Sequence, residues 1–532
     1  MEVCLINPPL SVHEFPHLAL PLLKGYLENH GIKCKTKDYN VEIMDDIINE
    51  GLEKVERYFY DRGLHITLNE VKRRFQNARN VFLLKDRNGK DERAQKLINT
   101  YLRIAGSDIF SICFKPDSLQ KIKETYQRCN IEADSNKIIK YIRETIIAYF
   151  KDNPYKIIGI SIPFTSQIFY ALIIGREIKK ILPDCKVVLG GPQISLFWKI
   201  LTDHLPFHQS FDAMIYGNGE IALEKYIKAI YQNENIESVP NLIYFDKNNV
   251  LHINEEEKIK DMIDIPLPNF SDLPLDKYIF AKLPYQMSRG CYWSKCVFCS
   301  YRNNKGYIAR KVEMVAEHFK QLEERYDRHI FQFIDDAIHP NILTSFAKAL
   351  KKNNMKIRYD AYLRLDAGFT AEVCKFLAES GLKNVLFGFE SANQRMLNFM
   401  QKGNTPENML YVMKNMKNAG IQNILSCLIG FPTETREEAW ESIQFLKQNR
   451  EWYYWVYIVH FGLISDMCNN AEKYGLYDIN YNDLIRYDDS GFTALGYPYK
   501  TSIGMTVEEA YQVIKEGRKE LDITIFDDNF FS

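Results

Sequence analysis

The chain has 532 residues, of which 46% are hydrophobic, and its 68 lysines and arginines nearly balance its 69 aspartates and glutamates. A chain of this length exceeds one ordinary hydrophobic core, so we expect several folded units. The balanced charge argues against nucleic acid or an anionic membrane surface as the main partner. We therefore expect a protein that binds neither.

The N-terminal sequence, MEVCLINPPL, lacks the basic region and the long apolar core of a signal peptide. The longest uncharged run, residues 157–175, contains Ser161, Pro163 and Gln167, which predicts a strand, a turn and a helix rather than a membrane span. The 11 cysteines show no framework spacing and indicate reduced thiols. These features predict a cytoplasmic location.

Short apolar runs alternate with helical patterns in the N-terminal part. Strands are expected over residues 2–9, 33–38, 156–164, 186–192 and 213–216, and helices over 18–29, 167–181 and from 220 onward. Strands that alternate with helices are typical of a doubly wound parallel sheet. We expect a Rossmann-like α/β domain over residues 1–235.

Residues 41–152 interrupt this domain with five helical patterns, at about 42–58, 68–85, 92–106, 117–127 and 136–151. A connection of this length is too long for a loop, which predicts a small helical insertion. A solvated cap and a role in substrate recognition or cofactor coverage both remain open for it.

The rest of the chain divides into three predicted parts. Residues 236–280 are rich in charge and then in proline, which predicts a linker. Residues 281–465 return to the alternation, with strands expected over 285–288, 330–334, 357–364, 384–388, 423–429 and 455–461. Six such steps predict a partial (β/α)6 barrel of the TIM type, with active loops at the carboxyl ends of its strands. Residues 466–532 predict a small, mostly helical extension with a helix over 507–521.

Three cysteines, Cys291, Cys296 and Cys299, directly follow the Ser-Arg-Gly segment 288–290. A structural zinc site takes four protein ligands, usually as two pairs, and no second pair follows closely here. Three thiolates suit a 4Fe–4S cluster whose fourth iron stays open for another ligand. Three cysteines in a loop without a metal are the alternative, and the sequence downstream favours the cluster.

This motif and the sequence after it resemble the radical SAM superfamily. Phe298 precedes the third cysteine as in that family, although four residues instead of three separate the first two cysteines. The matching downstream segments are 331–336 (FQFIDD), 388–391 (GFES), 400–403 (MQKG) and 430–435 (GFPTET), with Thr433 in place of a glycine. The resemblance implies a 4Fe–4S cluster on the three cysteines, an anaerobic reaction, and an electron donor such as flavodoxin or ferredoxin.

The same resemblance implies that S-adenosylmethionine (SAM) contacts Phe298, Asp335, Asp336, Arg364, Glu390 and Gly430. An acid at the end of a strand suits the SAM amino group, whose protons need acceptors. A helix cap is the alternative for the two aspartates, and a surface ion pair is the alternative for Arg364.

The N-terminal part resembles the cobalamin-binding domain that precedes the barrel in one radical SAM class. The matching segments are 6–9, 18–20, 159–165, 190–193 and 217–220. Glycines at strand ends let the backbone approach a large flat ligand. The resemblance implies cobalamin contacts from Asn7, Pro8, Phe164, Thr165, Gln167, Gly190, Gly191, Gln193, Tyr216, Gly217, Gly219 and Glu220. The chain has no Asp-x-His-x-x-Gly sequence, so no lower axial histidine of the mutase type is expected. Glycines that only make tight turns are the alternative.

Together these resemblances imply a cobalamin-dependent radical SAM C-methyltransferase. It would act on an unactivated carbon of a small molecule or peptide through a 5′-deoxyadenosyl radical and methylcobalamin. Cys427 and Cys468 are weak candidates for a catalytic acid, base or radical quencher, with a core position as the alternative. The sequence leaves the substrate and the oligomeric state open.

Three other functions remain as alternatives. The first is a cobalamin-dependent radical SAM cyclase or oxidoreductase without methyl transfer. The second is a methylthiotransferase, which needs a second cluster on three N-terminal cysteines, but Cys4, Cys34 and Cys113 are widely scattered. The third is a non-catalytic sensor that binds cobalamin or an iron–sulfur cluster.

Overall fold

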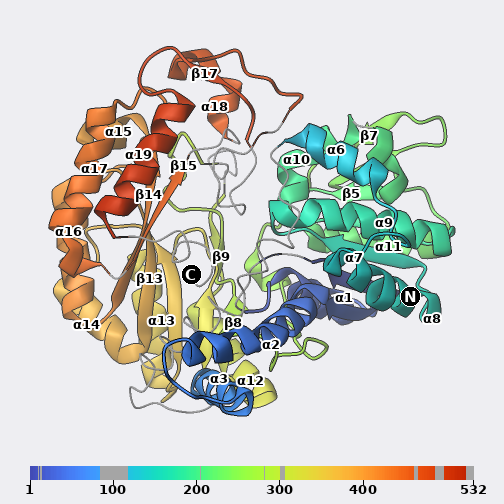
Figure 1. Cartoon of the computed structure of the whole chain (residues 1–532), viewed down its shortest axis with the longest axis horizontal. Coiled ribbons are helices and arrows are strands. Elements are labelled where there is room, and N and C mark those ends of the chain that lie inside the picture. The colour runs from blue at the N-terminus through green and yellow to red at the C-terminus, as the bar shows by residue number, and fades with distance from the viewer. Residues whose placement is uncertain are drawn as a thin grey trace.

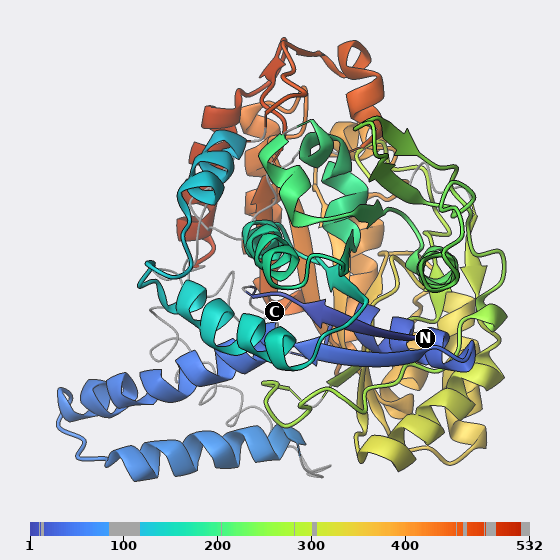
Figure 2. The same ribbon diagram turned by 90° about the vertical axis from the view of Figure 1, so that its right-hand side faces the viewer.

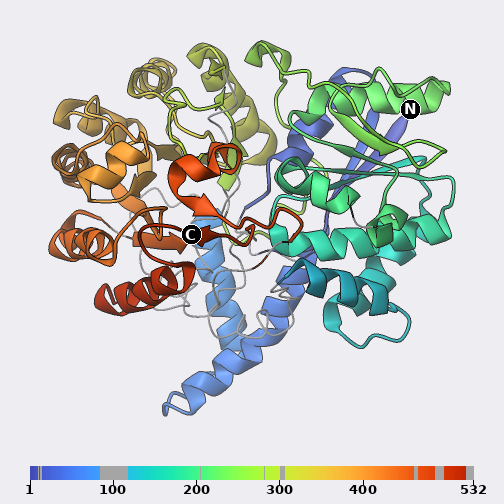
Figure 3. The same cartoon turned by 90° about the horizontal axis from the view of Figure 1, so that it is seen from above.

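The computed structural model describes residues 1–9, 15–83, 118–203, 205–280, 282–299, 306–453, 455–460, 465–483 and 496–522, together with Ser11 and Ile485. Two α/β units lie side by side, with the N-terminal unit on the right of Figure 1 and the C-terminal unit on the left; the view from above in Figure 3 separates them in the same way. None of the helices in the described ranges is long and apolar enough to cross a membrane.

The N-terminal sheet has seven strands in the order β2-β1-β3-β4-β5-β6-β7. They are β1 (Glu2–Asn7), β2 (Lys33–Asp38), β3 (Ile157–Ser161), β4 (Lys186–Gly190), β5 (Ala213–Ile215), β6 (Leu242–Phe245) and β7 (Leu251–Ile253). The first five strands are parallel, and the last two are antiparallel additions. The parallel order 2-1-3-4-5 has its switch point between β1 and β3, where doubly wound folds bind ligands beyond the strand ends.

Helices cover both faces of this sheet because its central strands are apolar on both sides. All five residues of β3 are buried, as expected for an inner parallel strand. The helices α1 (Ala19–Asn29) and α11 (Gly219–Gln232) pack on one face, and α9 (Ile168–Ile181) and α10 (Pro192–Thr202) pack on the other. The prediction of a doubly wound α/β sheet is confirmed.

Residues 236–280 are more than the linker that we expected from the sequence. They supply β6 and β7 to the N-terminal sheet, and they brace its opposite edge through Asp272. The Asp272 carboxylate accepts hydrogen bonds from Lys24 Nζ at 2.8 Å, Lys35 Nζ at 2.9 Å and the Thr36 backbone N–H at 3.0 Å. The short apolar run of β6 was hidden in the sequence by the charged residues around it.

The helical insertion has two parts. The helices α2 (Tyr39–Tyr60) and α3 (Leu68–Leu83) form a hairpin that projects from the body, at the lower left of Figure 2. The second part consists of α6 (Leu119–Arg128), α7 (Lys137–Tyr141), the π-helical turn η2 (Ile142–Ile147) and α8 (Ala148–Asp152). Its isoleucines pack into the same hydrophobic core as α9. The helices predicted at 42–58, 68–85, 117–127 and 136–151 are present, and the one at 92–106 lies outside the described residues.

The C-terminal unit is a six-stranded parallel sheet in the order β15-β14-β13-β12-β11-β8, which confirms the predicted partial barrel. The strands are β8 (Lys282–Tyr285), β11 (Ile330–Phe333), β12 (Arg358–Leu363), β13 (Leu382–Glu390), β14 (Gln422–Ile429) and β15 (Trp455–His460). The helices between them are α12 (Val312–Tyr326), α13 (Pro340–Lys352), α14 (Ala371–Ser380), α15 (Gln394–Phe399), α16 (Pro406–Asn418) and α17 (Arg436–Gln448). A two-stranded ribbon of β9 (Ser288–Arg289) and β10 (Ile308–Ala309) follows β8.

The C-terminal extension completes the barrel instead of standing apart from it. Its helix α19 (Val507–Glu520) packs on β15 and α17, in the place of a sixth outer helix. A Cβ on Gly517 would lie 2.6 Å from the Ile443 side chain, so glycine permits this close approach. The extension also contains α18 (Asp466–Asn469), β16 (Leu476–Tyr477) and β17 (Lys500–Thr501).

We expect Asp272→Ala to destabilise the N-terminal unit by about 2 kcal/mol, because it removes one of the two carboxylates that pair with the buried Lys24 ammonium, the other being Glu28, and takes away the acceptor of the Thr36 N–H. The measurement is the urea midpoint followed by tryptophan fluorescence and circular dichroism. Lys500→Ala is the control, since its pair with Asp478 is exposed and contributes little. Equal midpoints for the two variants would contradict a bracing role for Asp272.

Candidate functional site

A cavity of about 790 Å³ lies between the two units, where the carboxyl ends of both sheets meet. Leu5, Gly159, Ser161, Gly190 and Ile215 line it from the N-terminal sheet, and Pro284, Gln286, Arg289, Ile334, Asp336 and Tyr362 line it from the barrel. Sites for small molecules and cofactors commonly have volumes of about 300–1,000 Å³. The cavity therefore has the size of a cofactor site and stands at the position where both folds bind ligands.

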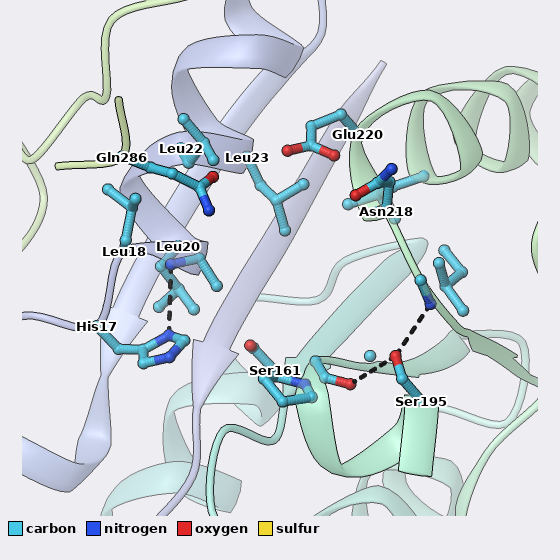
Figure 4. Close-up of a pocket in the computed structure, with 18 of the residues that line it drawn as sticks. His17, Leu18, Leu20, Leu22, Leu23, Ser161, Ser195, Asn218, Glu220 and Gln286 are labelled. Atoms are coloured by element: carbon cyan, nitrogen blue, oxygen red, sulfur yellow. Dashed lines mark hydrogen bonds between the residues drawn. The ribbon is translucent and has the colours of Figure 1, made fainter. Parts of the chain in front are cut away.

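Two glycine-containing loops form the N-terminal wall of the cavity. The Ser195 hydroxyl joins them, because it accepts a hydrogen bond from the Gly217 N–H at 2.9 Å and donates one to the Gly191 carbonyl at 3.4 Å (Figure 4). Gly191 has φ +98°, and a Cβ there would lie 2.8 Å from Ile162 N. A Cβ on Gly190 would meet a single protein atom within 4 Å, so a side chain at this position would enter the cavity.

Seven of the twelve residues that the sequence assigned to cobalamin line this cavity: Phe164, Gly190, Gly191, Tyr216, Gly217, Gly219 and Glu220. The other five, Asn7, Pro8, Thr165, Gln167 and Gln193, are not among its lining residues. Gln167 donates hydrogen bonds to Asn7 Oδ1 at 2.9 Å and to the Pro8 carbonyl at 2.5 Å. Thr165 donates to Gln193 Oε1 at 2.9 Å. The side chains of Asn7, Thr165, Gln167 and Gln193 brace the loops behind the cavity.

His17 is a cavity residue that the sequence analysis missed (Figure 4). Its Nδ1 accepts a hydrogen bond from the Ala19 N–H at 3.4 Å. Burial lowers the pKa of His17 to about 4, so the ring is neutral at physiological pH. His17 belongs to no recognised sequence motif. It reaches the cavity only because of how the chain folds between the strand and the helix that flank it.

The loop that carries the three cysteines is held by residues 400–403. The Val297 N–H donates to the Met400 carbonyl at 3.0 Å, and Trp293 Nε1 donates to the Gln401 carbonyl at 2.8 Å. Gly403 has φ +73°, and a Cβ there would lie 2.1 Å from the Trp293 ring. The ring therefore packs directly on the Gly403 backbone, and these contacts fix the loop with its four-residue first gap.

Arg364 lies beside the cysteine loop, at the end of β12. Its guanidinium stands 4.3 Å from the centre of the Trp293 ring and donates a hydrogen bond to the Lys402 carbonyl at 2.7 Å. Burial raises the pKa of the Cys296 thiol, whereas the cations of Lys402 and Arg364 act in the opposite sense. Arg364 is only 4% exposed, but its Nε lies 3.6 Å from Asp366 Oδ2, so the ion pair that was its alternative is present, with the arginine itself buried.

The three cysteines fit an iron–sulfur cluster better than a single ion. Cys296 is buried, and Cys291 and Cys299 are half-buried. Within the described residues, no group of three or more His, Cys, Asp or Glu side chains converges on one metal ion. A 4Fe–4S cluster does not need such convergence, because each thiolate binds a different iron. The neighbouring cations Arg364 and Lys402 suit the negative charge of such a cluster.

Glu390 and Lys402 form a buried ion pair next to the cysteine loop. Lys402 Nζ lies 2.8 Å from Glu390 Oε1, and both side chains are less than 10% exposed. A Cβ on Gly388 would lie 2.5 Å from Glu390 Oε1 and 2.7 Å from Lys402 Nζ, so the glycine leaves room for the pair. The sequence segment around Lys402 was recognised, but only the structure shows that the lysine reaches Glu390.

The two adjacent aspartates after β11 have different positions. The Asp335 carboxylate is fully buried and accepts hydrogen bonds from the backbone N–H groups of Met287 and Ser288 and from the Ser288 hydroxyl at 2.6 Å. Burial raises the pKa of Asp335 to about 7. Asp335 therefore caps the segment before the cysteines, which corrects its expected contact with SAM. Asp336 lines the cavity, and its contact with SAM stays a prediction.

The Gly430 N–H, which the sequence assigned to SAM, donates to Glu434 Oε2 at 2.7 Å. The same oxygen accepts from the Phe431 N–H at 3.3 Å, and burial raises the pKa of Glu434 to about 8. Thr433 has φ +70°, in the region that favours the glycine of the resembled family. Phe298 meets Phe431 edge to face at 6.0 Å, so this loop packs against the cysteine loop.

Among the described residues, no cysteine lines the cavity. Cys427 is fully buried, donates from Sγ to the Glu390 carbonyl at 3.4 Å, and has a pKa raised well above its ordinary value by burial. This supports its core alternative and removes it as a catalytic candidate. Cys4 and Cys34 are buried in the N-terminal core. The side chain of Cys468 and all of Cys113 lie outside the described residues.

Glu434 predicts a pH dependence of stability. The pKa of Glu434 is about 8 in the folded chain and 4.5 as its ordinary value. The folded chain therefore has its full stability from this group below pH 4.5 and loses it as the pH rises through 8. We expect Glu434→Gln to unfold at a higher temperature than wild type at pH 9, with little difference at pH 5. Asp335 adds a slope of the same sign in both proteins. An equal change of melting temperature with pH in wild type and Glu434→Gln would contradict a buried, neutral Glu434 carboxyl group.

Residues 285–446 match the Radical SAM superfamily. An uncharacterized methyltransferase of Pyrococcus horikoshii is 30% identical over 299 residues, which cover 55% of this chain and 64% of that protein. The anaerobic magnesium-protoporphyrin IX monomethyl ester cyclase of Rubrivivax gelatinosus is 23% identical over 286 residues, which cover 52% of this chain and 50% of that protein. The chain thus spans less than two thirds of the length of either relative.

The fold is similar to that of the radical SAM methyltransferase TsrM from Kitasatospora setae, whose structure contains cobalamin and a [4Fe-4S] cluster. The TM-score is 0.57 at 16% sequence identity, and the match covers 90% of this chain and 80% of TsrM. Such a match places the N-terminal sheet and the barrel in one common architecture. Residues 285–446 thus match the radical SAM domain, and the chain shares the overall fold of TsrM.

Proposed function

We propose that this protein is a cobalamin-dependent radical SAM enzyme that transfers a methyl group to a carbon atom. The single observation that carries the proposal is the shared cavity. The glycine loops of the N-terminal sheet form one wall, and Arg289 and Gly290, directly before Cys291, form part of the other. A ligand bound to the N-terminal unit and a cluster bound to the barrel would thus both border this cavity.

The N-terminal wall fits a large flat cofactor. Gly190 and Gly219 present backbone to the cavity, and a Cβ on either would meet only one protein atom, at 3.9 Å and 3.7 Å. Tyr216 and Phe164 add aromatic surface beside them. These residues would hold cobalamin, with the Ser161 and Ser195 hydroxyls as polar partners for its substituents.

The barrel has residues for a 4Fe–4S cluster and SAM next to this cavity. The three cysteine thiols would ligate the cluster. Asp336, which lines the cavity, and the buried Glu390–Lys402 pair, which is not among its lining residues, offer charged groups of both signs for SAM. When bound, the cluster and SAM supply a radical that takes hydrogen from carbon, and cobalamin supplies a carrier for the methyl group. The chain itself holds these groups in one orientation and keeps water from the space between them.

Methyl transfer is favoured over other radical reactions by the relative and the structural neighbour that are named methyltransferases. Radical cyclisation is the second candidate, because another relative is named a cyclase. For both reactions we propose a small-molecule or peptide substrate and a protein electron donor. The methylthiotransferase alternative loses support, since Cys4 and Cys34 are buried in two different hydrophobic clusters of the core.

The experiment that tests the proposal is reductive SAM cleavage. Protein reconstituted with iron and sulfide should release 5′-deoxyadenosine after addition of dithionite and SAM, as measured by chromatography. Replacement of Cys291, Cys296 and Cys299 by alanine should abolish the product and the brown chromophore, because the thiolates bind the cluster. Cys374→Ala, a buried barrel cysteine away from the loop, is the control. About four irons per chain in the triple variant would refute the assignment.

A second prediction concerns the glycine wall, which is the side of the cavity formed by the loops that contain Gly190, Gly191, Gly217 and Gly219. Gly190→Leu should weaken cobalamin binding at least tenfold, because its side chain would project into the cavity, whereas Gly190→Ala should have a smaller effect. Binding is followed by the change in cobalamin absorbance on titration. Iron content and 5′-deoxyadenosine formation should persist in both variants, since Gly190 lies on the opposite wall from the cysteine loop. Unchanged affinity in Gly190→Leu would place cobalamin elsewhere.

A further inference from the structure

Arg289 connects the cysteine loop to the N-terminal unit. It ends β9, two residues before Cys291, and its guanidinium pairs with the Glu220 carboxylate at the start of α11. The same guanidinium donates hydrogen bonds to Asn218 Oδ1 at 3.2 Å and, within the barrel, to Gln286 Oε1 at 3.0 Å. One side chain therefore joins two units that are separated by the cavity.

The backbone of Arg289 is fixed on its other side. The buried Asp335 carboxylate holds the N–H groups of the two preceding residues, Met287 and Ser288. The following residue, Gly290, has φ +77°, and a Cβ there would lie 2.9 Å from the Gly306 carbonyl. Residues 287–291 thus have little conformational freedom, so a displacement of Arg289 would also displace Cys291.

The ion pair between Arg289 and Glu220 is buried, so each charge needs the other as its partner. The side chains of Glu220 and Arg289 are 3% and 14% exposed. Burial acts to raise the pKa of Glu220, but the charge and hydrogen bond of Arg289, a backbone hydrogen bond and the Arg310 charge together outweigh it, and the pKa is lowered. Glu220 also lies in the first turn of α11, where the helix dipole favours a negative charge. A buried charge without its partner is costly, so the two units are held to one separation.

We infer that Arg289 is a positioning residue that sets the cysteine loop against the glycine wall of the cavity. This role rests on the proposed function, since it matters only when a cofactor occupies each wall. It assigns Glu220, which the sequence predicted to contact cobalamin, to the link between the units. Arg289 and Glu220 act through the position of Cys291 and of α11 and not on a reacting atom.

The test compares Arg289→Gln, Glu220→Gln and the double variant with Lys225→Gln. Lys225 lies on the same helix as Glu220, but its pair with Glu257 is exposed, with 48% and 44% of the side chains accessible. Hydrogen–deuterium exchange is measured on cluster-reconstituted protein without cobalamin. Residues 217–221 and 286–291 should both exchange at least tenfold faster in each single variant, the double variant should add little, and the control should match wild type.

A second measurement reports the geometry itself. The protein is loaded with hydroxocobalamin and reduced, and pulsed EPR gives the distance between Co(II) and the reduced cluster. We expect a distance distribution at least twice as wide in Arg289→Gln, with partial recovery in Arg289→Lys, which keeps the charge but not the planar set of donors. Faster exchange in only one segment, or an unchanged distribution, would overturn the inference. Failure of wild type to bind cobalamin would refute the proposed function, whereas the exchange rates would still show whether Arg289 links the two units.

Discussion

Parallel strand pairing is the constraint on which the rest of this structure depends. In the N-terminal sheet it brings the ends of β1, β3, β4 and β5 to one edge, and in the barrel it does the same for β8, β11 and β12. Because the two edges face one another across the cavity, residues hundreds of positions apart line one space. Helices on the outer faces provide the burial that keeps each sheet in register.

Buried carboxylates hold the loops at these edges. Asp335 accepts from the N–H groups before the cysteines, Glu434 from those after β14, and Asp38 from Val41 at the start of α2. Each replaces water for backbone donors that no strand or helix partner satisfies. Burial raises the pKa of all three acids, so the same groups that order the loops also make their order sensitive to alkaline pH.

Features written in local sequence were predictable, and features made by packing were not. The cysteine triplet and the glycine loops were found because their chemistry needs those residue types at those spacings. Asp335 and Asp336 are adjacent and alike, and only the direction of each side chain separates a cap from a cavity residue. The reach of Lys402 to Glu390 crosses two elements. The sheet membership of β6 and the place of α19 in the barrel also depend on distant partners.

The contact between Trp293 and Gly403 has a consequence for how this protein can vary. The ring occupies the volume that any side chain at position 403 would need, with 2.1 Å to a Cβ there. A larger residue at 403 is therefore compatible only with a smaller one at 293, which would also leave the Arg364 guanidinium without its aromatic face. The four-residue gap between Cys291 and Cys296, Trp293 within it, and Gly403 therefore depend on one another, and a change in one of them requires changes in the others.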